Sequence, residues 1–78
     1  MQPDTIDKVS IGRRIASVRT LRGFRQDEVA DALGVSRFTV SKWERGVQLP
    51  HGDALARLCL LLDCSSDYLL TLTDALHG

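Results

Sequence analysis

The chain has little of several things that many folds and functions require. Only 5% of its 78 residues are aromatic, it has two cysteines and two prolines, and its formal net charge is zero. No apolar run approaches the ~20 residues of a membrane-spanning helix, and there is no signal peptide. We therefore expect a cytoplasmic chain, with no membrane partner, whose cysteines are reduced.

The sequence also lacks the patterns of a metal site or an active site. The only Cys and His residues are His51, Cys59, Cys64 and His77, and their spacing does not give the two close pairs of a zinc site. There is no Gly-rich phosphate loop and no motif of paired carboxylates, and a set of short helices leaves little room for a cleft. We expect two cysteines in a helical core, no metal, no cofactor and no enzymatic activity.

What the chain does have is enough apolar side chains for one small core. Hydrophobic residues make up 44% of the sequence, and with so few aromatics the core must be built from Leu, Val and Ala. A domain of this size buries only about 60% of its unfolded surface, so its stability should be modest without a partner.

The most informative stretch is 26–46, QDEVADALGVSRFTVSKWERG. Gly34 favours the left-handed conformation that ends a helix, Ser36 is a good N-cap for a second helix, and Gly46 is expected to end that one. Apolar residues recur at the spacing that gives each helix one buried face, namely Val29, Ala30 and Leu33 in the first helix and Val40 and Trp43 in the second. The stretch therefore predicts two short helices joined by a tight turn.

The outward face of the second helix is unusual for a solvated surface. It carries three cations, a hydroxyl and an aromatic ring, on Arg37, Phe38, Ser41, Lys42 and Arg45. The major groove of DNA admits one α-helix and presents hydrogen-bond acceptors and thymine methyl groups. A protruding helix of this composition is suited to that groove.

The zero net charge hides a polarised distribution. Residues 8–46 contain nine basic and four acidic side chains, a net +5, whereas residues 47–78 carry a net −3 and residues 1–7 a net −2. A basic half that includes the outward face just described is the electrostatic footprint of a nucleic-acid-binding protein.

The stretch from Gln26 to Gly46 resembles the helix-turn-helix of the Cro/repressor-type, or Xre-type, family of phage repressors and bacterial regulators. The shared pattern is Gln-x-x-Val-Ala-x-x-Leu-Gly-Val-Ser-x-x-Thr-Val-Ser-x-Trp-Glu-x-Gly. The resemblance implies an all-α, compact five-helix DNA-binding domain over residues 10–71. A flexible arm over residues 1–9 would precede it, and a tail over residues 72–78 would follow it as a dimer contact or a linker.

The fold that the resemblance implies assigns expected roles to the DNA-facing residues. Phosphate contacts are expected from Gln26, which matches the family's helix-start Gln, from Arg13 near the start of the first helix, and from Arg45. Base edges would be read by Arg37, Phe38 and Lys42, with Ser36 and Ser41 nearer the boundary between base and backbone.

Two further positions bear on the same surface. Arg19 and Glu44 match family positions that form an ion pair between the first and third helices, which would hold Glu44 away from phosphates. Arg25 stands where relatives usually have a capping Thr, Ser or Asn, so the N-cap is weakened. Asp27 and Glu28 partly compensate through the helix dipole.

Helices are also expected on either side of the motif. The first should span about residues 10–22 with Ser10 as N-cap, and a fourth should begin at His51 or Gly52 and end at Asp63 in place of the usual Gly. Their apolar positions are Ile11, Ile15, Val18 and Leu21 in the first and Leu55, Leu58, Cys59 and Leu62 in the fourth.

The C-terminal end predicts a homodimer contact. Ser65 should cap a short fifth helix, and Leu72, Ala75 and Leu76 have the helical spacing that would extend it. We expect the dimer contact to use Tyr68, Leu69, Leu72 and Leu76.

The function that follows is a sequence-specific DNA-binding transcriptional regulator, a repressor that binds an inverted-repeat operator as a homodimer. Two alternatives remain open at this point. One is the DNA-binding antitoxin of a toxin–antitoxin pair, which also binds a partner protein, and the other is a protein-interaction module of the same fold. Some repressors of the family carry a further oligomerisation domain, which nothing in this sequence resembles. A partner protein and a C-terminal effector domain outside this sequence both remain open.

Overall fold

The computed structural model describes residues 7–72, 74 and 76. Within them the chain forms five helices and no strand: α1 (Lys8–Leu21), α2 (Gln26–Leu33), α3 (Arg37–Glu44), α4 (Gly52–Leu62) and α5 (Ser66–Leu69). The expected all-α, five-helix architecture is confirmed. No helix in this part of the chain is long and apolar enough to cross a membrane.

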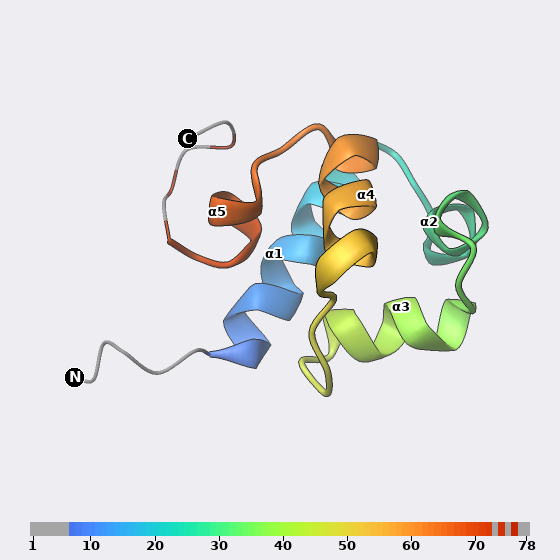
Figure 1. Cartoon of the computed structure of the whole chain (residues 1–78), viewed down its shortest axis with the longest axis horizontal. Coiled ribbons are helices and arrows are strands. Elements are labelled where there is room, and N and C mark those ends of the chain that lie inside the picture. Colours follow the sequence, from blue (N-terminus) through green and yellow to red (C-terminus); the bar gives the residue numbers. More distant parts are fainter. Residues whose placement is uncertain (1–6, 73, 75, 77–78) are drawn as a thin grey trace.

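The helices pack around one core. In Figure 1, α4 passes in front of α1 and α3 lies along the lower edge. Helix α2 packs against α3 and α4, and α5 packs against α1 and α4 on the other side. The buried hydrophobic residues are Ile11, Ile15, Val18, Val29, Ala30, Leu33, Val40, Trp43, Leu58, Leu62, Cys64 and Leu69. Among the described residues none that is polar or charged is buried as a whole, although the Glu44 side chain is only 7% exposed, so the fold is held together mainly by apolar burial. The prediction that Leu21 belongs to the core is wrong, since this last residue of α1 is 64% exposed.

Helix α1 begins earlier than expected. Its N-cap is Asp7, whose Oδ1 accepts from the backbone N–H of Val9 at 3.1 Å and of Ser10 at 3.3 Å. The prediction of Ser10 as N-cap is therefore wrong: its hydroxyl donates to Asp7 Oδ2 at 2.7 Å instead. These hydrogen bonds, first that of the Ser10 hydroxyl, lower the pKa of the Asp7 carboxyl. Lys8 and Val9, expected in a flexible arm, are helical, and residues 1–6 lie outside the described part.

The caps around the helix-turn-helix agree with the sequence. Gly34 ends α2 with a left-handed φ of 73°. Ser36 Oγ accepts from the backbone N–H of Thr39 at 3.0 Å and caps α3, and Gly46 follows the end of α3 with a φ of 75°. Glu28 accepts from the backbone N–H of Arg25 at 2.8 Å and replaces part of the missing cap on α2.

The outer helices α4 and α5 also end and begin at the expected residues. Helix α4 ends at Asp63, which has a left-handed φ of 54°. Ser65 caps α5, because its Oγ accepts from the backbone N–H of Tyr68 at 3.0 Å.

The crossing of α1 over α3 was not visible in the sequence. A Cβ atom on Gly12 would lie 2.5 Å from the carbonyl oxygen of Glu44 and 2.6 Å from that of Trp43. Real side chains do not approach a backbone so closely, so only glycine allows α1 to lie this close to the C-terminal turn of α3. This contact fixes the angle at which α3 leaves the core.

The chain reverses after α5. Thr71 has a left-handed φ of 63°, and the backbone N–H of Ser65 donates to the carbonyl of Leu76 at 2.7 Å. The expected helical extension is therefore wrong for Leu72, Asp74 and Leu76, none of which is helical. Ala75 lies outside the described residues.

The expected dimer residues separate into two kinds. Leu69 is 0% exposed and belongs to the core, so its assignment as a dimer contact is wrong. Tyr68 and Leu76 are partly buried and pack against the core of their own domain, whereas Leu72 is 68% exposed. Of the four, Leu72 is the one whose side chain is mostly free to meet another molecule.

Candidate nucleic-acid interface

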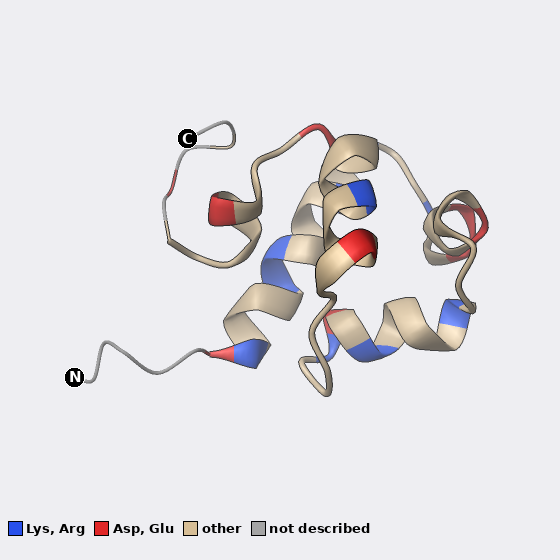
Figure 2. Ribbon diagram, in the orientation of Figure 1, with Lys and Arg blue, Asp and Glu red and all other residues tan. Residues whose placement is uncertain are grey.

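Helix α3 presents a face that is fixed from behind. Val40 and Trp43 are buried on its inner side, and this anchoring turns Arg37, Phe38 and Arg45 outward, where all three are exposed. Figure 2 shows Lys and Arg spaced along α3, while acidic residues lie on α2, α4 and α5.

The outward side chains of α3 hold one another in place. Lys42 Nζ lies 4.8 Å from the centre of the Phe38 ring, a cation–π contact, although the ring remains 65% exposed. Arg45 Nε donates to Ser41 Oγ at 3.1 Å. Each contact joins residues one helical turn apart, so the two pairs form a preformed cationic and apolar surface.

Ser36 differs from these residues because its hydroxyl is already used. Its Oγ caps α3 and lies 3.0 Å from Thr39 Oγ1. The cap role agrees with the sequence, and it leaves the hydroxyl less available to a base than the side chains of Arg37 and Lys42.

The carboxylate of Glu44 is paired with a cation inside a small hydrogen-bond network. Arg19 donates to it through Nε at 2.6 Å and Nη2 at 3.1 Å, and the two side chains are only 18% and 7% exposed. The pair expected from the resemblance is therefore present and mostly buried. Arg19 Nη1 also donates to the carbonyl of Phe24 at 2.8 Å, which links the α1–α2 connection to α3.

Gln26 joins the same network, which the sequence did not indicate. Its Nε2 donates to Glu44 Oε1 at 2.9 Å. Gln26 is the first residue of α2, so this hydrogen bond holds the N-terminus of α2 against the C-terminal turn of α3. No signal in the sequence pointed to this contact, because Gln26 and Glu44 are 18 positions apart and lie on different helices.

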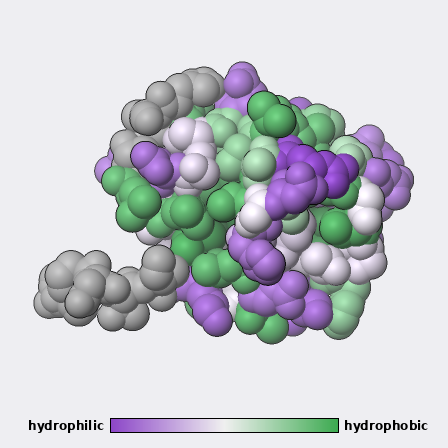
Figure 3. Space-filling model, viewed as in Figure 1, coloured by the Kyte–Doolittle hydropathy of each residue, from purple (hydrophilic) through white to green (hydrophobic). Residues whose placement is uncertain are grey.

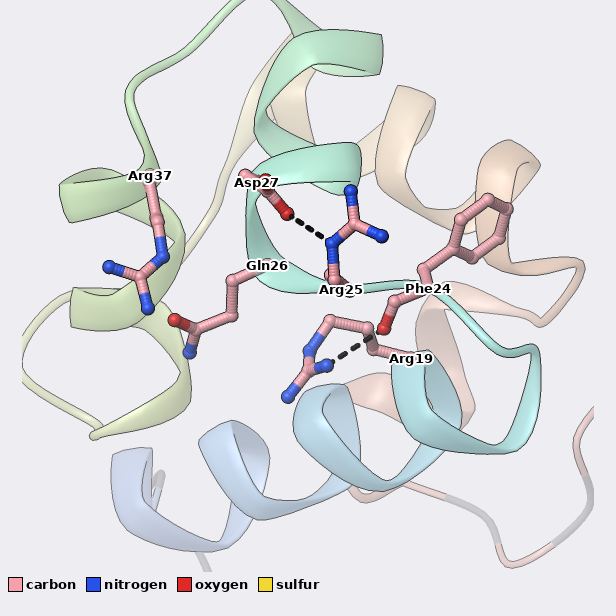
Figure 4. Close-up of a pocket in the computed structure, with 6 residues that line it drawn as sticks. All are labelled: Arg19, Phe24, Arg25, Gln26, Asp27 and Arg37. Carbon is pink, nitrogen blue, oxygen red and sulfur yellow. Dashed lines mark hydrogen bonds and ion pairs between the residues drawn. The ribbon is translucent and has the colours of Figure 1, made fainter.

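A hollow of about 520 Å³ lies beside this network, open to solvent (Figure 4). It contains the N-terminal turn of α2, where backbone N–H groups favour anions. Its lining residues are Arg19, Phe24, Arg25, Gln26, Asp27 and Arg37. The lining carries three guanidinium groups and one carboxylate, and Arg19 is paired with Glu44 beside the hollow. Asp27 is paired with Arg25 at 3.1 Å, and this hydrogen bond is the first cause of the lowered pKa of its carboxyl.

Arg13 lies apart from the hollow. It is exposed on α1, and its charge contributes to the lowered pKa of Asp7, after the hydrogen bonds from Ser10 and Val9. The structure therefore brings Gln26 and Arg37 together at one hollow, while Arg13 remains separate from that pair.

The metal-type ligands do not assemble. Within the described residues there is no group of three or more His, Cys, Asp or Glu side chains that could hold a metal ion. Cys64 is buried and Cys59 half-buried.

The geometry agrees with the comparison to known families. A family model described as helix-turn-helix matches residues 15–69, which include the whole α2–turn–α3 unit. The chain belongs to this helix-turn-helix family. The Cro/repressor-type resemblance of the sequence is thus confirmed.

Two named members of the helix-turn-helix family are similar in sequence to this chain. The repressor protein C2 of Salmonella phage P22 is 40% identical over 60 residues, which are 77% of this chain and 28% of that protein. The HTH-type transcriptional regulator ImmR of Bacillus subtilis is 36% identical over 62 residues, 80% of this chain and 49% of that protein. The chain therefore spans less than half the length of either relative. Both names are those of regulators and neither is that of an enzyme.

Solved structures of helix-turn-helix proteins have the same fold. The P22 c2 repressor in complex with a synthetic operator matches with a TM-score of 0.72 at 39% identity, covering 76% of this chain and 89% of that one. SinR, a master regulator for biofilm formation, in complex with DNA matches with a TM-score of 0.70 at 34% identity, covering 77% and 97%.

Proposed function

We propose that this helix-turn-helix domain binds duplex DNA with α3 in the major groove and acts as a sequence-specific transcriptional repressor. The observation that carries the proposal is the outward face of α3, exposed and cationic while Val40 and Trp43 anchor its inner side. A rigid helix with such a face satisfies the requirement for base recognition, since its side chains start from fixed positions. Repression then requires only that the domain occupy a promoter.

Base recognition is assigned to the first turns of α3. Arg37 follows the cap and can bond guanine O6 and N7 together, while the exposed Phe38 ring suits a thymine methyl group. Lys42 lies over that ring and adds a cation to the same groove. Ser36 and Ser41 are placed at the boundary between base and backbone.

Phosphate recognition is assigned to the edges of the same surface. The hollow at the N-terminus of α2, lined by Arg25, Gln26 and Arg37, is the proposed site of one phosphate, which Gln26 would contact. Arg13 on α1 and Arg45 after α3 would meet phosphates further along the strand. Such contacts set the register of the protein on the duplex and carry no base information themselves.

We also propose that two copies bind an inverted repeat, because one short helix contacts too few bases to be selective alone. Figure 3 shows apolar surface over α5 and the adjoining part of α1, and Leu72 lies exposed on the segment that follows α5. This surface, together with the exposed parts of the partly buried Tyr68 and Leu76, is the proposed dimer contact. We assign the DNA-binding domain to residues 10–71, extended to Lys8 because α1 begins there. The proposed site of action is the cytoplasm.

One selection tests the main proposal. Rounds of binding to random duplex DNA, followed by fluorescence anisotropy on the enriched and a scrambled sequence, should give an inverted-repeat motif with at least about a thousandfold preference at physiological salt. Binding that is equal on both sequences, or no binding at all, would contradict it. Capture of a protein rather than DNA would then favour an interaction module.

A further inference from the structure

The C-terminal end of α4 is closed by two cysteines. Asp63 takes the left-handed conformation, the backbone N–H of Cys64 donates to the carbonyl of Cys59 at 3.1 Å, and that of Asp63 donates to the carbonyl of Leu60 at 3.3 Å. This pair of hydrogen bonds is the Schellman motif, in which the side chains of the two outer residues contact each other across the turn. Those two residues are Cys59 and Cys64, the only cysteines in the chain.

The two cysteines lie at one hollow, and Cys59 is the more accessible of the two. Each thiol influences the pKa of the other, as expected for neighbouring side chains. Both line an open hollow of about 520 Å³, whose other lining residues are Ala56, Leu60, Asp63 and Ser65. Cys59 is half-buried, while Cys64 is only 8% exposed. A small reagent therefore meets Cys59 first, with Cys64 in contact behind it.

We propose that this helix cap is a modifiable dithiol, which closes to an intramolecular disulfide by exchange with a small-molecule disulfide such as oxidised glutathione. The Cys59 thiolate attacks one sulfur of the reagent, whose S–S bond breaks and releases one small thiolate. The Cys64 thiolate then attacks Cys59 Sγ and expels the second. Two protein thiols and one small disulfide thus become one protein disulfide and two small thiols.

The geometry favours closure over two separate modifications. A disulfide forms without backbone movement only where the two Cβ atoms face each other within about 4.5 Å. The Schellman hydrogen bonds hold the backbones of the two residues together across one turn, and both residues line the same hollow, so the folded state raises the effective concentration of one thiol at the other. In the unfolded chain the same residues are joined only by a flexible loop.

The surroundings of the two thiols set the rate of disulfide closure. Burial raises the pKa of both thiols, that of Cys64 to about 11, although the charge of Arg22 from α1 opposes the shift. The neighbouring Cys59 and Asp63 act in the same direction as burial on Cys64. The reactive thiolate is therefore scarce at neutral pH, and the rate of closure should increase with pH up to the pKa of the thiols.

Closure should stabilise the fold and leave DNA binding alone. Arg22 Nε donates to the carbonyl of Leu62 at 2.7 Å and its Nη2 to that of Asp63 at 2.9 Å, so the cap is also the junction of α4 with α1. The same end of α4 lies at the top of Figure 1, across the domain from α3. The expected unchanged DNA affinity rests on the proposed DNA-binding function, whereas the expected gain in stability does not.

The test equilibrates the protein in buffers of reduced and oxidised glutathione, with and without urea. Remaining thiols are trapped with N-ethylmaleimide, and the species are counted by intact mass. We expect a species that is two hydrogen masses lighter and carries no glutathione, with an equilibrium constant at least about tenfold larger in native buffer than in urea. Equal constants in the two buffers, or a native product that carries glutathione on the two cysteines, would overturn the proposal.

Substitutions distinguish the contribution of the helix cap to disulfide closure from that of the two cysteines. Cys59→Ser and Cys64→Ser should each yield only the mixed disulfide with glutathione. Asp63→Gly, which keeps the left-handed turn, should close as well as the parent, and a loss of closure there would overturn the role of the cap. Operator affinity measured on the reduced and closed forms should agree within twofold; a larger change overturns the separation from α3, and absence of binding in both forms overturns the DNA-binding function instead.

Discussion

Glu44 lies in α3, the helix that we propose faces DNA, and its two neighbours Arg19 and Gln26 decide whether its charge matters. Arg19 and Gln26 donate three hydrogen bonds to its two oxygens, and its side chain is almost fully buried. A carboxylate held in this way is kept from the phosphates. The same bonds tie α1, α2 and α3 together, so the network supports both affinity and fold.

Arg19→Ala should separate these two effects. We expect a loss of about 1–3 kcal/mol in the free energy of unfolding, since hydrogen bonds to a charged group are removed. DNA affinity should fall further than this loss explains, because the freed carboxylate repels phosphate. Thermal unfolding and anisotropy titrations measure both quantities.

The double mutant Arg19→Ala, Glu44→Gln is the control for this prediction. It should recover part of the affinity, because the repelling charge is gone. Strictly additive losses in the mutant cycle would mean that the pair does not act as described.

Arg37 and Arg13 should fail in different ways when each is replaced by alanine. Arg37→Ala should relax the sequence preference at one position of each half-site, by about 1–3 kcal/mol. Arg13→Ala should weaken all duplexes equally and reduce the salt dependence by about one charge per protomer. Binding constants on operator and scrambled DNA over a salt series distinguish the two.

Arg57 supplies the matched control for both arginine variants. It is exposed on α4, where it pairs with Asp53 at 3.4 Å, so Arg57→Ala removes the same charge away from α3 and should change little. If Arg37→Ala weakened both DNAs equally, base recognition would have to be reassigned to Phe38 and Lys42.

At the scale of the helices, the crossing of α1 over α3 positions the whole DNA-facing surface. Gly12 allows the backbone of α1 to contact the last carbonyls of α3. Gly46 has a second close approach, since a Cβ there would lie 2.8 Å from Val9 Cα. Two glycines thus set how α1 and α3 meet.

Gly12→Ala should therefore be more harmful than its small size suggests. Alanine is the better helix former, yet its methyl group would lie 2.5 Å from a backbone oxygen, and the helices must move apart. We expect a net loss of about 1–3 kcal/mol in the free energy of unfolding, measured by chemical denaturation. Ser17→Ala, exposed on the same helix, should be nearly neutral, and equal effects of the two substitutions would exclude a packing cause.

At the scale of the molecule, charge and apolar surface point to separate tasks. Basic side chains lie along α3 and α1, acidic ones lie on α2, α4 and α5, and exposed apolar surface lies over α5 and α1. The net charge of −3 over residues 47–78 limits non-specific attraction to DNA, and the apolar surface is available to the proposed second copy.

The expected outcome is a dimer on DNA with half-sites about 34 Å apart. Sedimentation velocity at binding concentrations should give two protomers per operator duplex. Leu72→Ser should lower the cooperativity of binding without affecting the affinity for an isolated half-site. One protomer on an asymmetric site would rule out this assembly.

The sequence by itself determined the parts of this protein that depend on local chemistry. The stops and caps at Gly34, Ser36, Asp63 and Ser65 follow from which residues tolerate a left-handed backbone or can accept a hydrogen bond from a helix end. Apolar spacing gave most of the core for the same reason, because a helix repeats every 3.6 residues.

Only the tertiary structure decided what depends on which helices touch. The sequence did not show that Gln26 bonds Glu44 or that Gly12 meets α3, because these contacts join residues 18 or more positions apart in the chain. Leu69 has the same apolar character as Leu72, yet one is in the core and the other in solvent, since the chain reverses at Thr71. Periodicity identifies a face, and only packing decides whether that face meets its own core or another molecule.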